Sequence, residues 1–86
     1  KMNFFYEKLS SISKKNKHKT AISIKKKEIN FNQFWNSCKK MIKILKSNKI
    51  KSLAFIADSK YLDYVLVASC LISNITYIPL NKNLPF

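Results

Sequence analysis

The sequence predicts an α/β fold in which a short β-hairpin precedes a parallel βαβ unit with packed helices. Two short runs rich in β-formers, residues 21–24 and 29–31, flank a lysine turn, as the strands of a hairpin do. Further on, a continuous apolar run at 53–57, a helical stretch of about four turns and the run "TYIPL" at 76–80 follow one another. Strand, helix and strand in this order predict parallel strands joined by a right-handed crossover.

The N-terminal segment, residues 1–19, is expected to be a helix followed by a basic linker. Apolar residues at Phe4, Phe5, Leu9 and Ile12 are spaced for one helical face within residues 2–13. The stretch "KKNKHKT" that follows has no apolar residue, which indicates a solvated loop. Residues 20–86 then form the second part of the chain.

In the middle of the chain, the spacing of apolar residues predicts a helix over residues 33–45. Asn32 is placed to cap its start, and Asn48 lies where a helix end favours glycine or asparagine in the left-handed conformation. The expected buried stripe consists of Phe34, Cys38, Met41, Ile42 and Leu45. Lys39, Lys40, Lys43 and Lys46 lie mostly off this stripe, on a face expected to be solvated.

A second helix is predicted over residues 60–73, with Ser59 as its cap and Asn74 at its end. The run at 53–57 is apolar at every position, which is typical of a strand covered on both faces.

The charge is extreme, with 17 lysines, no arginine, four acids and a net charge of +13 in 86 residues. Such a balance favours nucleic acid or an anionic surface as a partner. However, arginine is the residue that reads bases and holds phosphate with two hydrogen bonds, and it is absent. The absence of glycine and the excess of Lys, Asn and Ile indicate an AT-rich coding bias instead. A small basic nucleic-acid-binding module therefore stays as an alternative.

Cys38 and Cys70 both fall on apolar helix stripes, so we expect two reduced core cysteines rather than a disulfide or a metal pair. No run of about 18 apolar residues is present, and the N-terminal stretch lacks the features of a signal peptide. We therefore expect a cytoplasmic protein without a membrane partner.

The sequence offers no complete set of catalytic side chains. Its one histidine, His18, lies in the basic loop, and the acids Glu7, Glu28, Asp58 and Asp63 are scattered. Asp58 follows a predicted parallel strand, where α/β folds place active sites, but a role in capping the next helix explains it as well. Metal-ligand spacing and a glycine-rich phosphate loop are missing, so we assign no catalytic, cofactor-binding or metal-binding residue.

Taken in order, the elements of residues 20–86 resemble the N-terminal region of the adenylate-forming (AMP-binding) enzymes. The family pattern "Ala-Ile … Leu-Thr-Tyr" is matched by Ala21-Ile22 and by residues 29–31, before the helix at 33–46 and the strand at 53–56. The most specific part is "TYIPLNKNLP", in which Tyr77, Pro79, Leu80 and Pro85 are in step with the family. Asn48 and Asn74 replace family glycines, and Asn81-Lys82 replace the usual Asp-Pro, so local geometry is in doubt at these positions.

The resemblance implies the N-terminal piece of a large domain that is incomplete at the C-terminal end of this chain. The full-length parent would be an ATP-dependent ligase that uses Mg²⁺, activates a carboxylate as an acyl-adenylate and transfers it to a thiol. The pattern is nearest to amino-acid adenylation domains and D-alanine–carrier protein ligases; an acyl-CoA synthetase is the alternative. Implied partners are the carboxylate substrate, coenzyme A or a carrier protein, and the remainder of the same domain.

The family's nucleotide loop and catalytic lysine lie beyond residue 86, so these 86 residues alone would not be an enzyme. A truncated, non-catalytic product with the same fold is a further alternative. If the chain is a piece of a larger domain, the strand at 76–80 and the helix at 60–73 should carry apolar faces that nothing in this chain covers.

Overall fold

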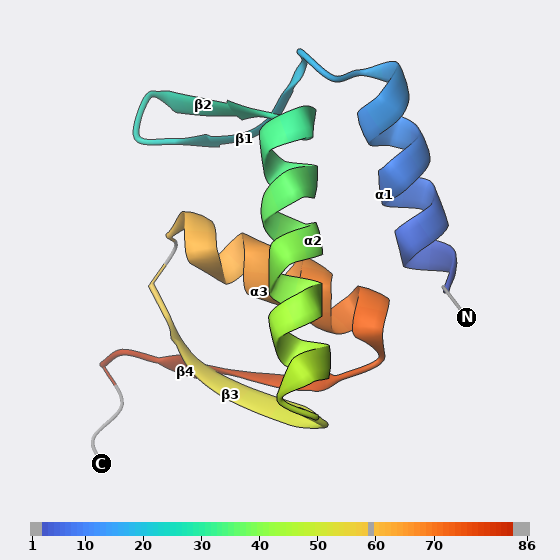
Figure 1. Cartoon of the computed structure of the whole chain (residues 1–86). Helices are drawn as coiled ribbons and strands as arrows, with labels where there is room; N and C mark the ends of the chain where they lie inside the picture. Colours follow the sequence, from blue (N-terminus) through green and yellow to red (C-terminus); the bar gives the residue numbers. More distant parts are fainter. Residues whose placement is uncertain (1–2, 59, 84–86) are drawn as a thin grey trace.

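The computed structural model describes residues 3–58 and 60–83, which form three helices and two separate two-stranded sheets. The elements are α1 (Phe4–Lys15), β1 (Thr20–Ile24), β2 (Lys27–Asn30), α2 (Phe31–Ser47), β3 (Ser52–Ala57), α3 (Tyr61–Ser73) and β4 (Thr76–Asn81). The chain is flattened, with extents of 43 × 36 × 18 Å. Figure 1 shows α1 beside α2, α3 crossing behind α2, the hairpin near the start of α2 and the sheet of β3 and β4 near its end.

The predicted hairpin is present and antiparallel, with Ile22 opposite Ile29 and Ile24 opposite Lys27. Its two turn residues, Lys25 and Lys26, have φ angles of 48° and 69°, which is the left-handed region. Two central residues with positive φ give the turn the twist that matches paired strands. The hairpin therefore forms although the turn lacks the glycine or asparagine that such angles favour.

The α2 helix begins at Phe31, two residues earlier than predicted, because Asn30 and not Asn32 is its cap. The Asn30 side chain accepts a hydrogen bond from the Gln33 backbone N–H at 2.8 Å, and the Gln33 side chain accepts one from the Asn30 backbone N–H at 3.0 Å. This reciprocal capping box stabilises the helix start and places Phe31 in the helix instead of a strand.

The predicted α2 stripe is confirmed, with Trp35 added to it. Phe34, Trp35, Cys38, Ile42 and Leu45 are buried, and Met41 packs beside them. The end of the helix differs from the prediction: Asn48 has a φ of −94°, and it is Lys49, at 53°, that adopts the left-handed conformation. Asn48 instead closes the helix with its side chain, which donates a hydrogen bond to the Ile44 carbonyl oxygen at 2.8 Å.

The α1 helix is present, but its predicted apolar face is confirmed only in part. Leu9 packs on the core together with Tyr6, whereas Phe4, Phe5 and Ile12 are exposed. The rotation of the helix is set by its contacts. The Tyr6 ring meets Trp35 edge-on at 5.1 Å between centroids. Asn3, the helix cap, donates hydrogen bonds to the Leu71 carbonyl oxygen and the Asn74 side chain.

The βαβ unit is confirmed: β3 and β4 pair in parallel, with Ser52 opposite Thr76 and Ala57 opposite Asn81. Asn74 ends α3 with φ 57° and ψ 38°, in the left-handed conformation favoured at a helix end. The start of α3 is Lys60, as its cap, followed by Tyr61; the predicted cap, Ser59, lies outside the described residues, as does Pro85.

The prediction that β3 is covered on both faces is wrong for this chain. Leu53, Phe55 and Ala57 are half-buried, whereas the alternate residues are exposed, with Ile56 at 59%. The apolar faces expected to lack cover are present: Ile78, Leu62 and Tyr64 are exposed by about half. The helices cover one face of this sheet and leave the other bare.

Cys38 and Cys70 are free thiols with no exposed surface, as predicted. Burial raises the pKa of the Cys38 thiol to about 11, with a hydrogen bond from Ser69 offsetting part of the effect. Burial also raises the pKa of Cys70. Both side chains therefore stay protonated at neutral pH and serve as packing groups.

Candidate functional site

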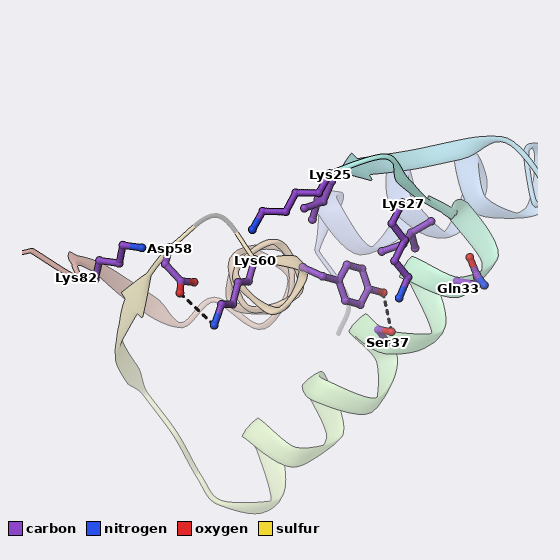
Figure 2. A pocket seen from close by; sticks show the side chains of 10 residues that line it. Lys25, Lys27, Gln33, Ser37, Asp58, Lys60 and Lys82 are labelled. Atoms are coloured by element: carbon purple, nitrogen blue, oxygen red, sulfur yellow. Dashed lines mark hydrogen bonds and ion pairs between the residues drawn. The ribbon is translucent and has the colours of Figure 1, made fainter.

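A cavity of about 690 Å³ lies where the hairpin, α2, the start of α3 and the ends of β3 and β4 meet. Part of its wall is apolar, contributed by Ile24, Ile29 and Tyr61. The charged part carries four lysines and one carboxylate: Lys25, Lys27, Lys60, Lys82 and Asp58. Figure 2 shows these side chains around the start of α3.

Asp58 lies at the carboxyl end of β3, as its place in the sequence suggested, and it lines the cavity. Its carboxylate forms an ion pair with the Lys60 ammonium group at 3.3 Å, drawn as a dashed line in Figure 2. The expectation that Asp58 caps the next helix is wrong, because Asp63 has that role. Asp58 is therefore a charge in the cavity wall and not a helix cap.

Asp63 holds the loop between β3 and α3 in place. One of its carboxylate oxygens, Oδ2, accepts hydrogen bonds from the backbone N–H groups of Asp58 at 2.9 Å and Lys60 at 3.0 Å. An acid in the first turn is also favourable toward the positive end of the helix dipole. This contact fixes the backbone from which both Asp58 and Lys60 extend.

The other end of the cavity is fixed by a contact between α2 and α3. The Tyr61 hydroxyl donates a hydrogen bond to the Ser37 hydroxyl oxygen at 2.8 Å, and the Tyr61 ring meets Phe34 edge-on. Figure 2 shows this hydrogen bond with Lys27 reaching toward it from β2. These contacts join α2 to the start of α3 at the wall of the cavity.

Sequence reasoning missed this convergence of lysines. The signal was weak, because lysine occurs throughout the chain and a lysine-rich stretch is usually a solvated face. Two of the four positions, the hairpin turn and the start of α3, do lie where the predicted topology brings chain segments together. The contact that completes the site, Tyr61 to Ser37, spans 24 residues and has no local pattern.

The other side chains weighed in the sequence are not part of this cavity. His18 is exposed in the loop after α1, and Glu7 is exposed on α1. Glu28 accepts a hydrogen bond from Thr20 across the hairpin. Among residues 3–58 and 60–83, no three His, Cys, Asp or Glu side chains come together as metal ligands would. No helix in that part of the chain is long and apolar enough to cross a membrane.

Comparison with known proteins gives one strong result. No family model matches the sequence, and no curated protein matches it. Among solved structures, the N-terminal subdomain of NpsA from Klebsiella oxytoca superposes with a TM-score of 0.81 at 18% identity, over 93% of this chain and 22% of that one. The chain has the fold of an adenylation-domain N-terminal subdomain.

Two further adenylation structures agree. An artificial fusion of NpsA and ThdA from Klebsiella oxytoca, an adenylation and PCP di-domain, gives a TM-score of 0.85 at 17% identity over 99% of this chain and 17% of that one. The Vibrio cholerae adenylation domain AlmE, in complex with glycyl-adenosine-5′-phosphate, gives 0.80 at 16% identity over 92% and 15%. This chain therefore spans about a fifth or less of the adenylation structures it matches.

Proposed function

We propose that this chain is the N-terminal part of an adenylate-forming ligase that activates an amino acid. The observation that carries the proposal is the superposition of nearly the whole chain on part of several adenylation-domain structures, one of which is an N-terminal subdomain. The motif "TYIPLN" supports it independently, because it lies on β4, the strand that the family pattern places at this point. The fold is thus reached both from sequence motifs and from shape.

The reaction of such a ligase has two steps. The substrate carboxylate attacks the α-phosphate of ATP and releases pyrophosphate, which leaves an acyl-adenylate. A thiol, on coenzyme A or on a carrier protein, then takes the acyl group and releases AMP. The adenylation and PCP fusion among the matching structures favours a carrier protein as the acceptor here.

The described residues of this chain do not fit a Mg²⁺ site. Hard cations bind carboxylate and other oxygen ligands, and no suitable group of acids gathers in this part of the chain. Asp58, the one acid in the cavity, is paired with Lys60. In this proposal the role of the described residues is that of a supporting layer.

Substrate-dependent exchange of pyrophosphate into ATP tests the proposal. The coding sequence beyond codon 86 is read, and the complete product is purified and assayed with the common amino acids and a series of fatty acids. Exchange with one amino acid is the expected result, and it identifies the substrate class at the same time.

Other outcomes of this assay separate the alternatives. Exchange with fatty acids alone would replace the proposal with an acyl-CoA synthetase. A stop codon directly after residue 86, with no exchange, would overturn it in favour of a non-catalytic product of the same fold. Adding coenzyme A or a carrier protein to the active product then identifies the thiol acceptor.

A further inference from the structure

We propose that the lysine-lined cavity is a binding site for an anion that carries several phosphate charges. The lysines come from three separate segments: Lys25 and Lys27 from the hairpin, Lys60 from the start of α3 and Lys82 from the residues after β4. Only folding brings these three segments together. The site is therefore a property of the tertiary structure and not of the lysine run in the hairpin alone.

The charges in the cavity wall are unbalanced. Four lysines and one acid, Asp58, line the cavity, and Lys60 pairs with the Asp58 carboxylate at 3.3 Å. This is the one ion pair found between side chains of residues 3–58 and 60–83. Like charges placed around a concave surface raise the local potential and attract counter-ions. A multiply charged anion would relieve the repulsion among Lys25, Lys27 and Lys82.

The arrangement selects for charge more than for shape. Lysine is a flexible point charge with three donors, so it binds phosphate oxygens without imposing a fixed geometry. Figure 2 shows Lys60 and Lys82 on either side of Asp58, and Lys27 near the Tyr61–Ser37 hydrogen bond. Charges spread along the cavity in this way suit a chain of phosphates better than a single phosphate.

The cavity is also large enough for such a ligand. Its volume of about 690 Å³ lies within the range of roughly 300–1,000 Å³ that small-molecule sites occupy. The backbone that carries the lysines is held by the Asp63 contacts to Asp58 and Lys60 and by the reciprocal cap of Asn30 and Gln33. The apolar wall formed by Ile24, Ile29 and Tyr61 could accommodate a base or another apolar group attached to the phosphates.

Calorimetric titration of the 86-residue chain with sodium tripolyphosphate, at low ionic strength, tests the site. Pyrophosphate and orthophosphate are titrated in parallel. We expect the affinity to be highest for tripolyphosphate, lower for pyrophosphate and lowest for orthophosphate. The double variant Lys25→Gln/Lys82→Gln should bind tripolyphosphate about tenfold or more weakly, because each lost charge-assisted hydrogen bond weakens binding. Asp58→Asn should bind it more tightly, because the substitution removes the one negative charge from the cavity.

The matched control is Lys40→Gln/Lys43→Gln, which changes the net charge by the same amount on the exposed surface of α2, outside the cavity. Circular dichroism confirms that every variant is folded. Equal weakening by the two double variants would overturn the proposal, because it would show attraction to the whole basic surface. Undetectable binding of tripolyphosphate by the folded chain would overturn it as well.

ATP as a titrant distinguishes two sources of the phosphates. Affinity for ATP equal to that for tripolyphosphate supports a site for inorganic polyphosphate, and tighter binding of ATP supports a nucleotide site in which the apolar wall contacts the base. Single-stranded DNA that binds both double variants equally well would identify non-specific binding of nucleic acid instead. The titration measures binding and not catalysis. A negative titration would therefore leave the proposed ligase function intact, and a negative exchange assay would leave the proposed anion site intact.

Discussion

Asp63 shows how one side chain can determine the local geometry of the site. Its Oδ2 atom accepts two backbone hydrogen bonds, from Asp58 and Lys60, and thereby fixes the turn that connects β3 to α3. Hydrogen bonds to charged acceptors contribute more than neutral ones. The neighbouring acid, Asp58, makes no such contact and is instead available to the cavity.

Replacing Asp63 should destabilise the chain to a degree that depends on the acceptor that remains. We expect Asp63→Ala to lower the free energy of unfolding by about 1–2 kcal/mol, because two backbone N–H groups at the start of α3 lose their partner. Asp63→Asn keeps one oxygen acceptor and should cost less. Urea unfolding followed by circular dichroism measures both; an equal loss in the two variants would contradict this role of the carboxylate.

The Cys38 thiol makes stability depend on pH in the alkaline range. Burial raises its pKa from 9.0 to about 11, so between these values the folded chain keeps a proton that the unfolded chain releases. The stability from the buried thiol is therefore complete below pH 9 and is lost as the pH rises toward 11. We measure the free energy of unfolding of the natural chain and of Cys38→Ala by urea unfolding between pH 9 and 11. We expect the natural chain to lose stability relative to the variant as the pH rises through this window. A difference between the two free energies that is constant with pH would contradict this role of Cys38.

At the scale of the elements, two asparagines end helices without the glycine that commonly follows a helix. Asn48 closes α2 with its side chain, and Asn74 adopts the left-handed conformation at the end of α3. In the hairpin turn, by contrast, two lysines adopt the left-handed conformation, since Lys25 and Lys26 both have positive φ angles. A non-glycine residue in this conformation costs about 1–2 kcal/mol.

Releasing this backbone strain should stabilise the chain. We expect Lys26→Gly to raise the free energy of unfolding by about 1 kcal/mol, because glycine adopts a φ of 69° without a steric clash. Lys26→Ala is the matched control, since it removes the same charge and keeps a Cβ atom. If the two variants are equally stable, the turn is not strained and the effect is one of charge.

At the scale of the whole molecule, the parallel sheet of β3 and β4 is packed against the helices on one face and exposed to solvent on the other. The buried residues form two hydrophobic clusters, and α2 contributes to both. Phe34, Cys38 and Ile42 belong to the first cluster, and Leu45 belongs to the second. On the opposite face of the parallel sheet, Ile56 and Ile78 are exposed by 59% and 49%. Exposed apolar faces of this kind mark sites where another part of a protein packs.

Making this bare face polar should change association and not stability. We expect Ile56→Ser/Ile78→Ser to lower the free energy of unfolding by less than about 1 kcal/mol, because both side chains already contact solvent. Ile72→Ala, which truncates a core side chain 5% exposed, should cost about 2–5 kcal/mol. Light scattering at increasing concentration should show less association for the double variant. A loss of stability as large as that of Ile72→Ala would contradict the exposure of this face.

The sequence by itself determined which elements form and in what order. Helical periodicity predicted the α2 stripe, and the strand, helix, strand pattern predicted a parallel pair, because these signals are local and repeat along the chain. The motif around "TYIPL" extended this to a fold that the solved structures share. Burial of the two cysteines followed from the same periodicity.

Only the tertiary structure decided how the elements turn toward one another. Which face of α1 is buried depends on the contact of Tyr6 with Trp35 and on that of Asn3 with Leu71. These partners lie 29 and 68 positions away in the sequence, so they leave no pattern in α1 itself. The start of α2 is by contrast a local feature, because its reciprocal hydrogen bonds join Asn30 and Gln33, three positions apart. The lysine-lined cavity also depends on the tertiary structure, because the fold brings the hairpin, the start of α3 and the residues after β4 together around it.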